Sequence, residues 1–108
     1  MKRSGLEKID AHLKEELKNG KFRKAYEIER AKVALAQKIA ELREEKRLRQ
    51  VDLAKKLGVS QQFVSQIETG QERNLTLETI IKIAESLGRG VKISFPKVTT
   101  HDSYLRIV

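Results

Sequence analysis

Three glutamines at short spacing are the residues best suited to recognition chemistry in this chain. Gln61 and Gln62 fall in the first turn of an expected short helix, and Gln66 lies one turn after Gln62 on the same face. A glutamine amide presents a donor beside an acceptor, which matches N6 and N7 of adenine in the major groove. Because a helix in the major groove contacts bases mainly with its first turn, the spacing predicts a base-reading face.

Other chemistry finds little support in the residue types. The 108 residues include no cysteine and only two histidines, His12 and His101, so metal ligands and disulfides are not expected. We find no nucleophile–base pair, carboxylate dyad or glycine-rich phosphate loop, and therefore expect no enzyme, cofactor or small-molecule ligand. With no signal-peptide pattern and no apolar run near the ~20 residues that span a bilayer, we expect a cytoplasmic protein without a membrane partner.

The charge favours a polyanionic partner without proving one. The net charge is +8, of which residues 1–32 carry +4 and residues 33–90 carry +2. Most of the charge therefore lies outside the segment with the glutamines. Binding of RNA or of any polyanion by charge alone remains an alternative, but it would leave the glutamine face without a role.

The apolar periodicity predicts a helical protein with a small β element. We expect about five helices, over residues 6–17, 22–47 (with a possible break near 31), 50–57, 60–68 and 76–87. Residues 91–95 alternate with period two and predict one strand, which ends at Pro96. A lone strand is not stable, so its partner would be a second copy of the chain or the weaker segment 104–108.

The segment from Gln50 to Gly70 has the residues that a helix-turn-helix needs. Ala54 is small enough for two helices to cross closely, and Gly58 can take the positive φ of the turn between them. The expected inward positions of the two helices and of their neighbours are Leu53, Leu57, Val59, Val64, Ile67, Ile39, Leu42, Leu48, Leu77, Ile80, Ile83 and Leu87.

Residues 33–90 resemble the helix-turn-helix family of the Cro/repressor (Xre-like) type, a bundle of four or five helices. The resemblance implies that Gln50 bonds a phosphate and braces the recognition helix, and that Gln61, Gln62 and Gln66 read bases. It also implies a salt bridge between Arg43 and Glu68. Glu68-Thr69-Gly70 fits the family's helix-ending signature, although many members have Asn at the middle position.

Further DNA contacts follow from position in this motif. We expect phosphate contacts from Gln50, Arg49, Ser65, Arg73, Asn74 and the amides at Thr76. Arg49 stands where relatives usually have a small N-cap residue. Two roles remain open for Phe63: contact with a thymine methyl or the sugar backbone, or packing against a neighbouring helix.

The arrangement around the motif resembles antitoxins of the HigA type. That resemblance implies a prokaryotic repressor of its own operon that also neutralises a RelE-like ribonuclease toxin. Residues 1–32 would then be a partner-binding arm, with Phe22, Tyr26, Leu13 and Leu17 as anchors. Against this, a basic toxin would meet an arm of charge +4. The alternative is a free-standing regulator whose arm only covers the core.

One recognition helix covers few base pairs, so we expect a homodimer on a palindromic operator of double-stranded DNA. We assign dimerisation to residues 91–108, with Leu87, Val91, Ile93 and Phe95 as candidate contacts.

Overall fold

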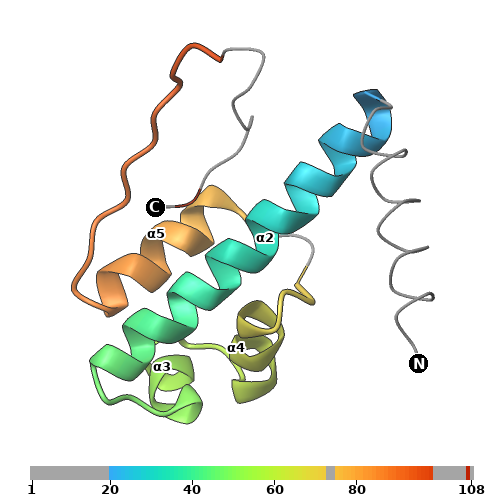
Figure 1. Cartoon of the computed structure of the whole chain (residues 1–108). Coiled ribbons are helices and arrows are strands. Elements are labelled where there is room, and N and C mark those ends of the chain that lie inside the picture. Colours follow the sequence, from blue (N-terminus) through green and yellow to red (C-terminus); the bar gives the residue numbers. More distant parts are fainter. Residues whose placement is uncertain (1–19, 73–74, 99–106, 108) are drawn as a thin grey trace, which may run out of the picture. The chain divides into compact units, whose positions relative to one another are not determined.

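A computed structural model of the chain describes residues 20–72, 75–98 and 107. This part contains the helices α2 (Gly20–Glu45), α3 (Gln50–Leu57), α4 (Gln61–Glu68) and α5 (Leu77–Ser86) (Figure 1). The chain divides into two compact units, one of residues 1–31 with 98–108 and one of residues 32–97. The second unit holds the expected reading domain. The helix expected over residues 6–17 and the segment 104–108, apart from residue 107, lie outside the described residues.

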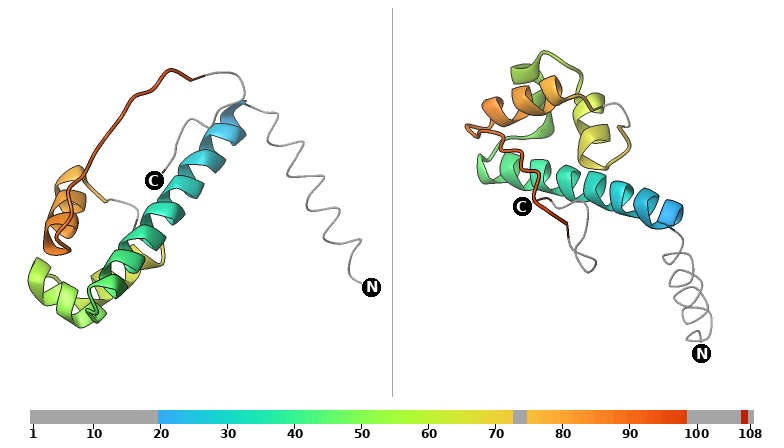
Figure 2. Two further views of the ribbon diagram at one scale, coloured as in Figure 1. Left: turned by 60° about the vertical axis from the view of Figure 1, so that its left-hand side comes forward. Right: turned by 90° about the horizontal axis from the view of Figure 1, so that it is seen from above.

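The observed helices begin and end close to the expected residues. The expected break near residue 31 is wrong, since α2 is one uninterrupted helix in both views of Figure 2. Its middle contains neither proline nor glycine, the residues that most often interrupt a helix. Among the described residues, no helix is both long and apolar enough to cross a membrane.

The core of the second unit is formed by one apolar cluster from all four helices. Leu53, Val64, Ile83 and Leu87 are the largest fully buried side chains. Burying each contributes about 1.5–3 kcal/mol relative to leaving it in water. The other members are Ile39, Ala54 and Ile67, and Leu35, Leu42, Leu48, Leu57, Phe63 and Leu75 pack against the cluster with partial burial. Ala36 of α2 is buried as well.

Two expected inward positions are wrong. Val59 is exposed because it follows the turn glycine, before α4 begins. Leu77 is 52% exposed as the first residue of α5, and the neighbouring Leu75 packs on the core instead.

No regular secondary structure is present over residues 88–98 (Figure 1). The strand expected at residues 91–95 is therefore not formed in the single chain, because no described segment pairs with it. Leu87, expected both as an inward position and as a dimer contact, is confirmed as an inward position only. It is 1% exposed and belongs to the chain's own core, so its side chain is not available as a dimer contact.

Candidate nucleic-acid interface

The turn between α3 and α4 depends on a glycine in the left-handed region. Gly58 has φ 71° and ψ 33°, a conformation that costs a residue with a Cβ about 1–2 kcal/mol. The N–H of Val59 donates to the carbonyl of Ala54 (3.0 Å) and closes the last turn of α3. Ala54 is 3% exposed, so a small side chain is buried just before the turn.

The start of α4 is capped in a way that fixes the orientation of its first turn. The Oγ of Ser60 accepts a hydrogen bond from the backbone N–H of Phe63 (3.1 Å), which satisfies one of the amides that the helix leaves unpaired. Gln61 and Gln62 lie in this first turn and are exposed, and Gln66 is half-buried one turn later. The three amides thus project from a short, capped helix.

Phe63 lies on another side of α4. It is half-buried and packs against the core cluster. Of the two roles left open by the sequence, the structure favours packing.

Side chains from α2 and α3 both bond to the carboxylate of Glu68. Arg43 of α2 donates two hydrogen bonds to this carboxylate, at 2.6 and 3.0 Å, and a third to the carbonyl of Leu48. The side-chain Nε2 of Gln50 donates to the same carboxylate (3.1 Å). Side-chain exposure is only 13% for Arg43 and 5% for Glu68. Bonding to Glu68 raises the pKa of Arg43, and these hydrogen bonds tie α2, α3 and α4 together.

Arg49 and Asp52 form a second, exposed ion pair at the start of α3. The Asp52 carboxylate accepts from the backbone N–H of Arg49 (2.8 Å) and from its guanidinium (3.0 and 3.1 Å). The side-chain hydrogen bond from Arg49, followed by the backbone one, lowers the pKa of Asp52 to about 2. The guanidinium is therefore engaged within the chain, and the pair as a whole carries no net charge.

Of the other residues expected to contact phosphate, the structure describes Thr76 and Ser65. Thr76 caps α5, since its Oγ1 accepts from the N–H of Thr79 (3.2 Å). Ser65 is half-buried on α4, and its carbonyl accepts from the N–H of Thr69 (3.0 Å). Arg73 and Asn74 lie outside the described residues.

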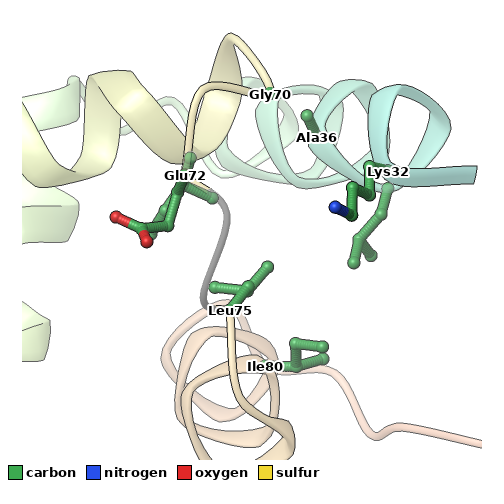
Figure 3. A pocket seen from close by; sticks show the side chains of 8 residues that line it. Lys32, Ala36, Gly70, Glu72, Leu75 and Ile80 are labelled. Carbon is green, nitrogen blue, oxygen red and sulfur yellow. The ribbon is translucent and has the colours of Figure 1, made fainter. Parts of the chain in front are cut away.

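A small cavity of about 110 Å³ lies between α2, α5 and the chain that leaves α4. Figure 3 shows Leu75 and Ile80 facing Ala36 and Lys32 of α2 across it. Its lining contains none of the three glutamines, so the cavity is separate from the expected base-reading face.

Asp52, the ion-pair partner of Arg49, is the contact at this site that the sequence reasoning missed. An acidic residue three positions after the N-cap was visible in the sequence, because Arg49 and Asp52 have the spacing of a capping box. The arginine at the cap position led to the expectation of a phosphate contact. In the structure, its guanidinium bonds to Asp52 of the same chain.

Comparison with known proteins identifies the family to which the chain belongs. The family model described as helix-turn-helix matches residues 39–92, which is half of the chain. No curated protein and no solved structure matches it. The matched range contains the capped α4, the Gly58 turn and the whole Glu68 network, so the chain belongs to the helix-turn-helix family of the Cro/repressor type and is a DNA-binding transcriptional regulator.

Proposed function

We propose that the chain is a sequence-specific repressor that binds, as a homodimer, a palindromic operator whose half-sites contain adenine. The observation that carries this proposal is the exposure of Gln61 and Gln62 in the first turn of the capped helix α4. Each amide can form two hydrogen bonds with one adenine, worth about 1–3 kcal/mol of discrimination against another base. Two copies would place their recognition helices about 10 base pairs apart, or at a multiple of that spacing.

The Glu68 network supports the proposal through Gln50. An amide nitrogen carries two N–H groups, and the bond from Gln50 to Glu68 uses one of them. The second can donate to a phosphate oxygen while the first keeps the side chain in place. Glu68 ends the recognition helix, so the same bond fixes a backbone contact relative to the base-reading face.

Selection from a pool of random double-stranded DNA, with the full chain as bait, tests this proposal. We expect an enriched two-fold symmetric site with adenine in each half. Gln61→Ala or Gln62→Ala should weaken binding to that site and change random DNA binding little. Gln37→Ala, an exposed glutamine on α2, is the matched control and should leave binding unchanged. Absence of any enriched sequence would instead support a charge-driven polyanion binder.

We also propose that the regulator is the antitoxin of a type II toxin–antitoxin pair and neutralises a RelE/HigB-like ribonuclease. The support is an aromatic pair on α2, ahead of the reading domain. Phe22 and Tyr26 lie one turn apart on one face of the helix, and each is 37% exposed. Aromatic side chains with such exposure are typical anchors of protein interfaces. Leu13 and Leu17, the other expected anchors, lie outside the described residues.

Co-expression with the product of a neighbouring ribonuclease-like gene tests the antitoxin role. We expect Phe22→Asp with Tyr26→Asp to abolish protection from the ribonuclease and to leave operator binding intact. Ile28→Asp is the control, because Ile28 has similar exposure (40%) on a different side of α2. If no such neighbour exists, or if the double variant still protects, the alternative of a free-standing regulator with a structural arm is favoured.

A further inference from the structure

The chain that follows α5 has the features of a strand without a partner. Residues 90–98 form no backbone hydrogen bond with another described residue, and Figure 1 shows them as an extended trace. Val91, Ile93 and Phe95 are 41%, 58% and 94% exposed. They alternate with Gly90, Lys92 and Ser94, which places the apolar residues on one face of an extended chain. Unpaired backbone and an apolar face together favour the addition of a second strand.

We propose that this second strand is the same segment of another copy, paired antiparallel about a two-fold axis through Ile93. The inference rests on the homodimer of the proposed function and adds the residues and the register of its contact. In this register Ile93 lies opposite Ile93, Val91 lies opposite Phe95, and Lys92 lies opposite Ser94.

Side-chain chemistry selects this register among the possible ones. An antiparallel pair brings directly opposite residues to the same face. Centring on Lys92 would place two ammonium groups opposite each other, which is unfavourable. Centring on Ser94 would place Val91 opposite Lys97. Centring on Ile93 keeps Val91, Ile93 and Phe95 opposite one another and forms two pairs of an aromatic with a β-branched residue, which are favourable.

The ends of the segment fit a short ribbon of this kind. At its start, Gly88 has φ 71°, the N–H of Arg89 donates to the carbonyl of Ala84 (2.8 Å), and the Arg89 guanidinium donates to Glu45 (2.9 Å). This ion pair neutralises the cation that the register brings opposite Lys97. At the other end, Pro96 has no N–H and ends the ladder.

The ribbon also needs cover on its apolar face, because an isolated two-stranded ribbon is only marginally stable. Leu77 and Ile81 of α5 lie one turn apart and are 52% and 40% exposed. They belong to the same unit as residues 91–97 and give the ribbon an apolar surface against which to pack.

Cysteine cross-linking of the full chain tests the register, since the chain has no cysteine of its own. Under mild oxidation, Ile93→Cys should form a disulfide-linked dimer, because the two-fold axis brings the residue close to its own copy. Val91→Cys alone should not, but a mixture of Val91→Cys and Phe95→Cys chains should give the mixed dimer. Lys92→Cys alone is the negative control on the other face.

Two outcomes would overturn the proposal, and only the first of them also overturns the homodimer of the proposed function. If the unmodified chain is monomeric by light scattering at micromolar concentration, the homodimer of the proposed function fails with it. If the chain is dimeric but Ile93→Cys does not cross-link, or Val91→Cys alone cross-links as well as Ile93→Cys, only the register fails. As a second variant without disulfide chemistry, Phe95→Asp should weaken the dimer by about tenfold or more, whereas Ile28→Asp should not.

Discussion

Arg43 and Glu68 are separated by 25 positions in the sequence and bind each other through two hydrogen bonds of 2.6 and 3.0 Å. The pair joins the last turn of α2 to the last residue of the recognition helix. Gln50, the first residue of α3, donates to the same carboxylate. A single carboxylate thus sets the positions of three helices, and its loss should affect both stability and DNA binding.

Replacing Arg43 with methionine should therefore be strongly destabilising. Arg43→Met keeps much of the side-chain length but leaves the Glu68 carboxylate nearly buried with only Gln50 as side-chain donor. Removing one partner of a buried pair costs about 3–5 kcal/mol. The partial exposure of Arg43 places our expectation near the lower end, about 3 kcal/mol, in the free energy of unfolding from urea titrations followed by circular dichroism.

An exposed ion pair on α5 supplies the control for this measurement. Lys82 and Glu78 are 3.2 Å apart with side-chain exposures of 63% and 78%, and pairs of this kind contribute about 0.3–0.5 kcal/mol. Lys82→Met should thus change stability far less. Similar losses in the two variants would show that Glu68 does not depend on Arg43.

Asp52 should contribute an acid-dependent part of the stability. Its pKa is lowered from 3.8 to about 2 in the folded chain, chiefly by the hydrogen bond from the Arg49 side chain. A group with a depressed folded pKa stabilises the fold above its unfolded pKa, and this contribution disappears as the pH falls through the folded value. The contribution should be complete above about pH 4 and decline from there towards pH 2.

Comparison of the wild type with Asp52→Asn isolates this contribution from that of the other carboxyl groups. The difference in unfolding free energy between the two should be constant near neutral pH and should shrink between about pH 4 and pH 2. Arg49→Gln should reproduce the same pattern, because it removes the main cause of the shift. A difference that stays constant down to pH 2 would contradict the ion pair.

Substitution of Gly58 should cost stability through the backbone alone. A Cβ at this position would meet no heavy atom within 4 Å, but φ is +71°. Gly58→Ala should thus lower the free energy of unfolding by about 1–2 kcal/mol, and Gly58→Asn should lower it less, because Asn adopts this conformation more readily. Gly90→Ala is the control, since it also meets open space without a positive φ; equal losses at the two sites would exclude backbone strain as the cause.

The helices and the turn could be predicted because local chemistry specifies them. Ser60 and Thr76 cap their helices through their own side chains. Gly58 ends α3 in the left-handed backbone conformation, which glycine adopts more readily than a residue with a Cβ. These features depend on neighbours in sequence. The expected helix ends are accordingly close to the observed ones, and the Arg43–Glu68 ion pair that the resemblance implied is present in the structure.

The role of Leu87, the partner of Arg49 and the fate of residues 91–95 depend on contacts that sequence periodicity does not reveal. Leu87 continues an apolar pattern, and nothing local distinguishes a core residue from an interface residue, yet the structure buries it. The sequence led us to expect a phosphate contact from Arg49, and periodicity does not reveal that its guanidinium also bonds to Asp52; the phosphate contact stays a prediction. Residues 91–95 have the pattern of a strand, but a strand also needs a second segment, and the single described chain does not provide one.

Phe63 should prove to be a packing residue. Phe63→Leu keeps an apolar side chain against the core, so we expect a stability loss below about 1.5 kcal/mol and unchanged affinity for the selected operator. Replacing operator thymines by deoxyuridine removes their methyl groups and tests the alternative directly. If Phe63 contacts a thymine methyl, one such replacement would weaken binding by the wild type more than binding by Phe63→Leu, whose smaller side chain makes less contact. We expect the same response from both proteins.

The pairing of Gln62 with adenine makes the sharpest prediction about the DNA-binding face. Gln62 is exposed in the first turn of α4, and its amide matches adenine N6 and N7 together. Gln62→Ala should weaken binding to the selected operator by about 1–3 kcal/mol. Replacing the contacted adenine with 7-deazaadenine, which lacks the N7 acceptor, should weaken binding by the wild type but add little to the loss in Gln62→Ala, because the hydrogen bond to N7 is already absent. Gln37→Ala should respond to the base change as the wild type does. Fully additive losses in the double change, measured by fluorescence anisotropy at fixed salt, would mean that Gln62 and the adenine N7 do not interact.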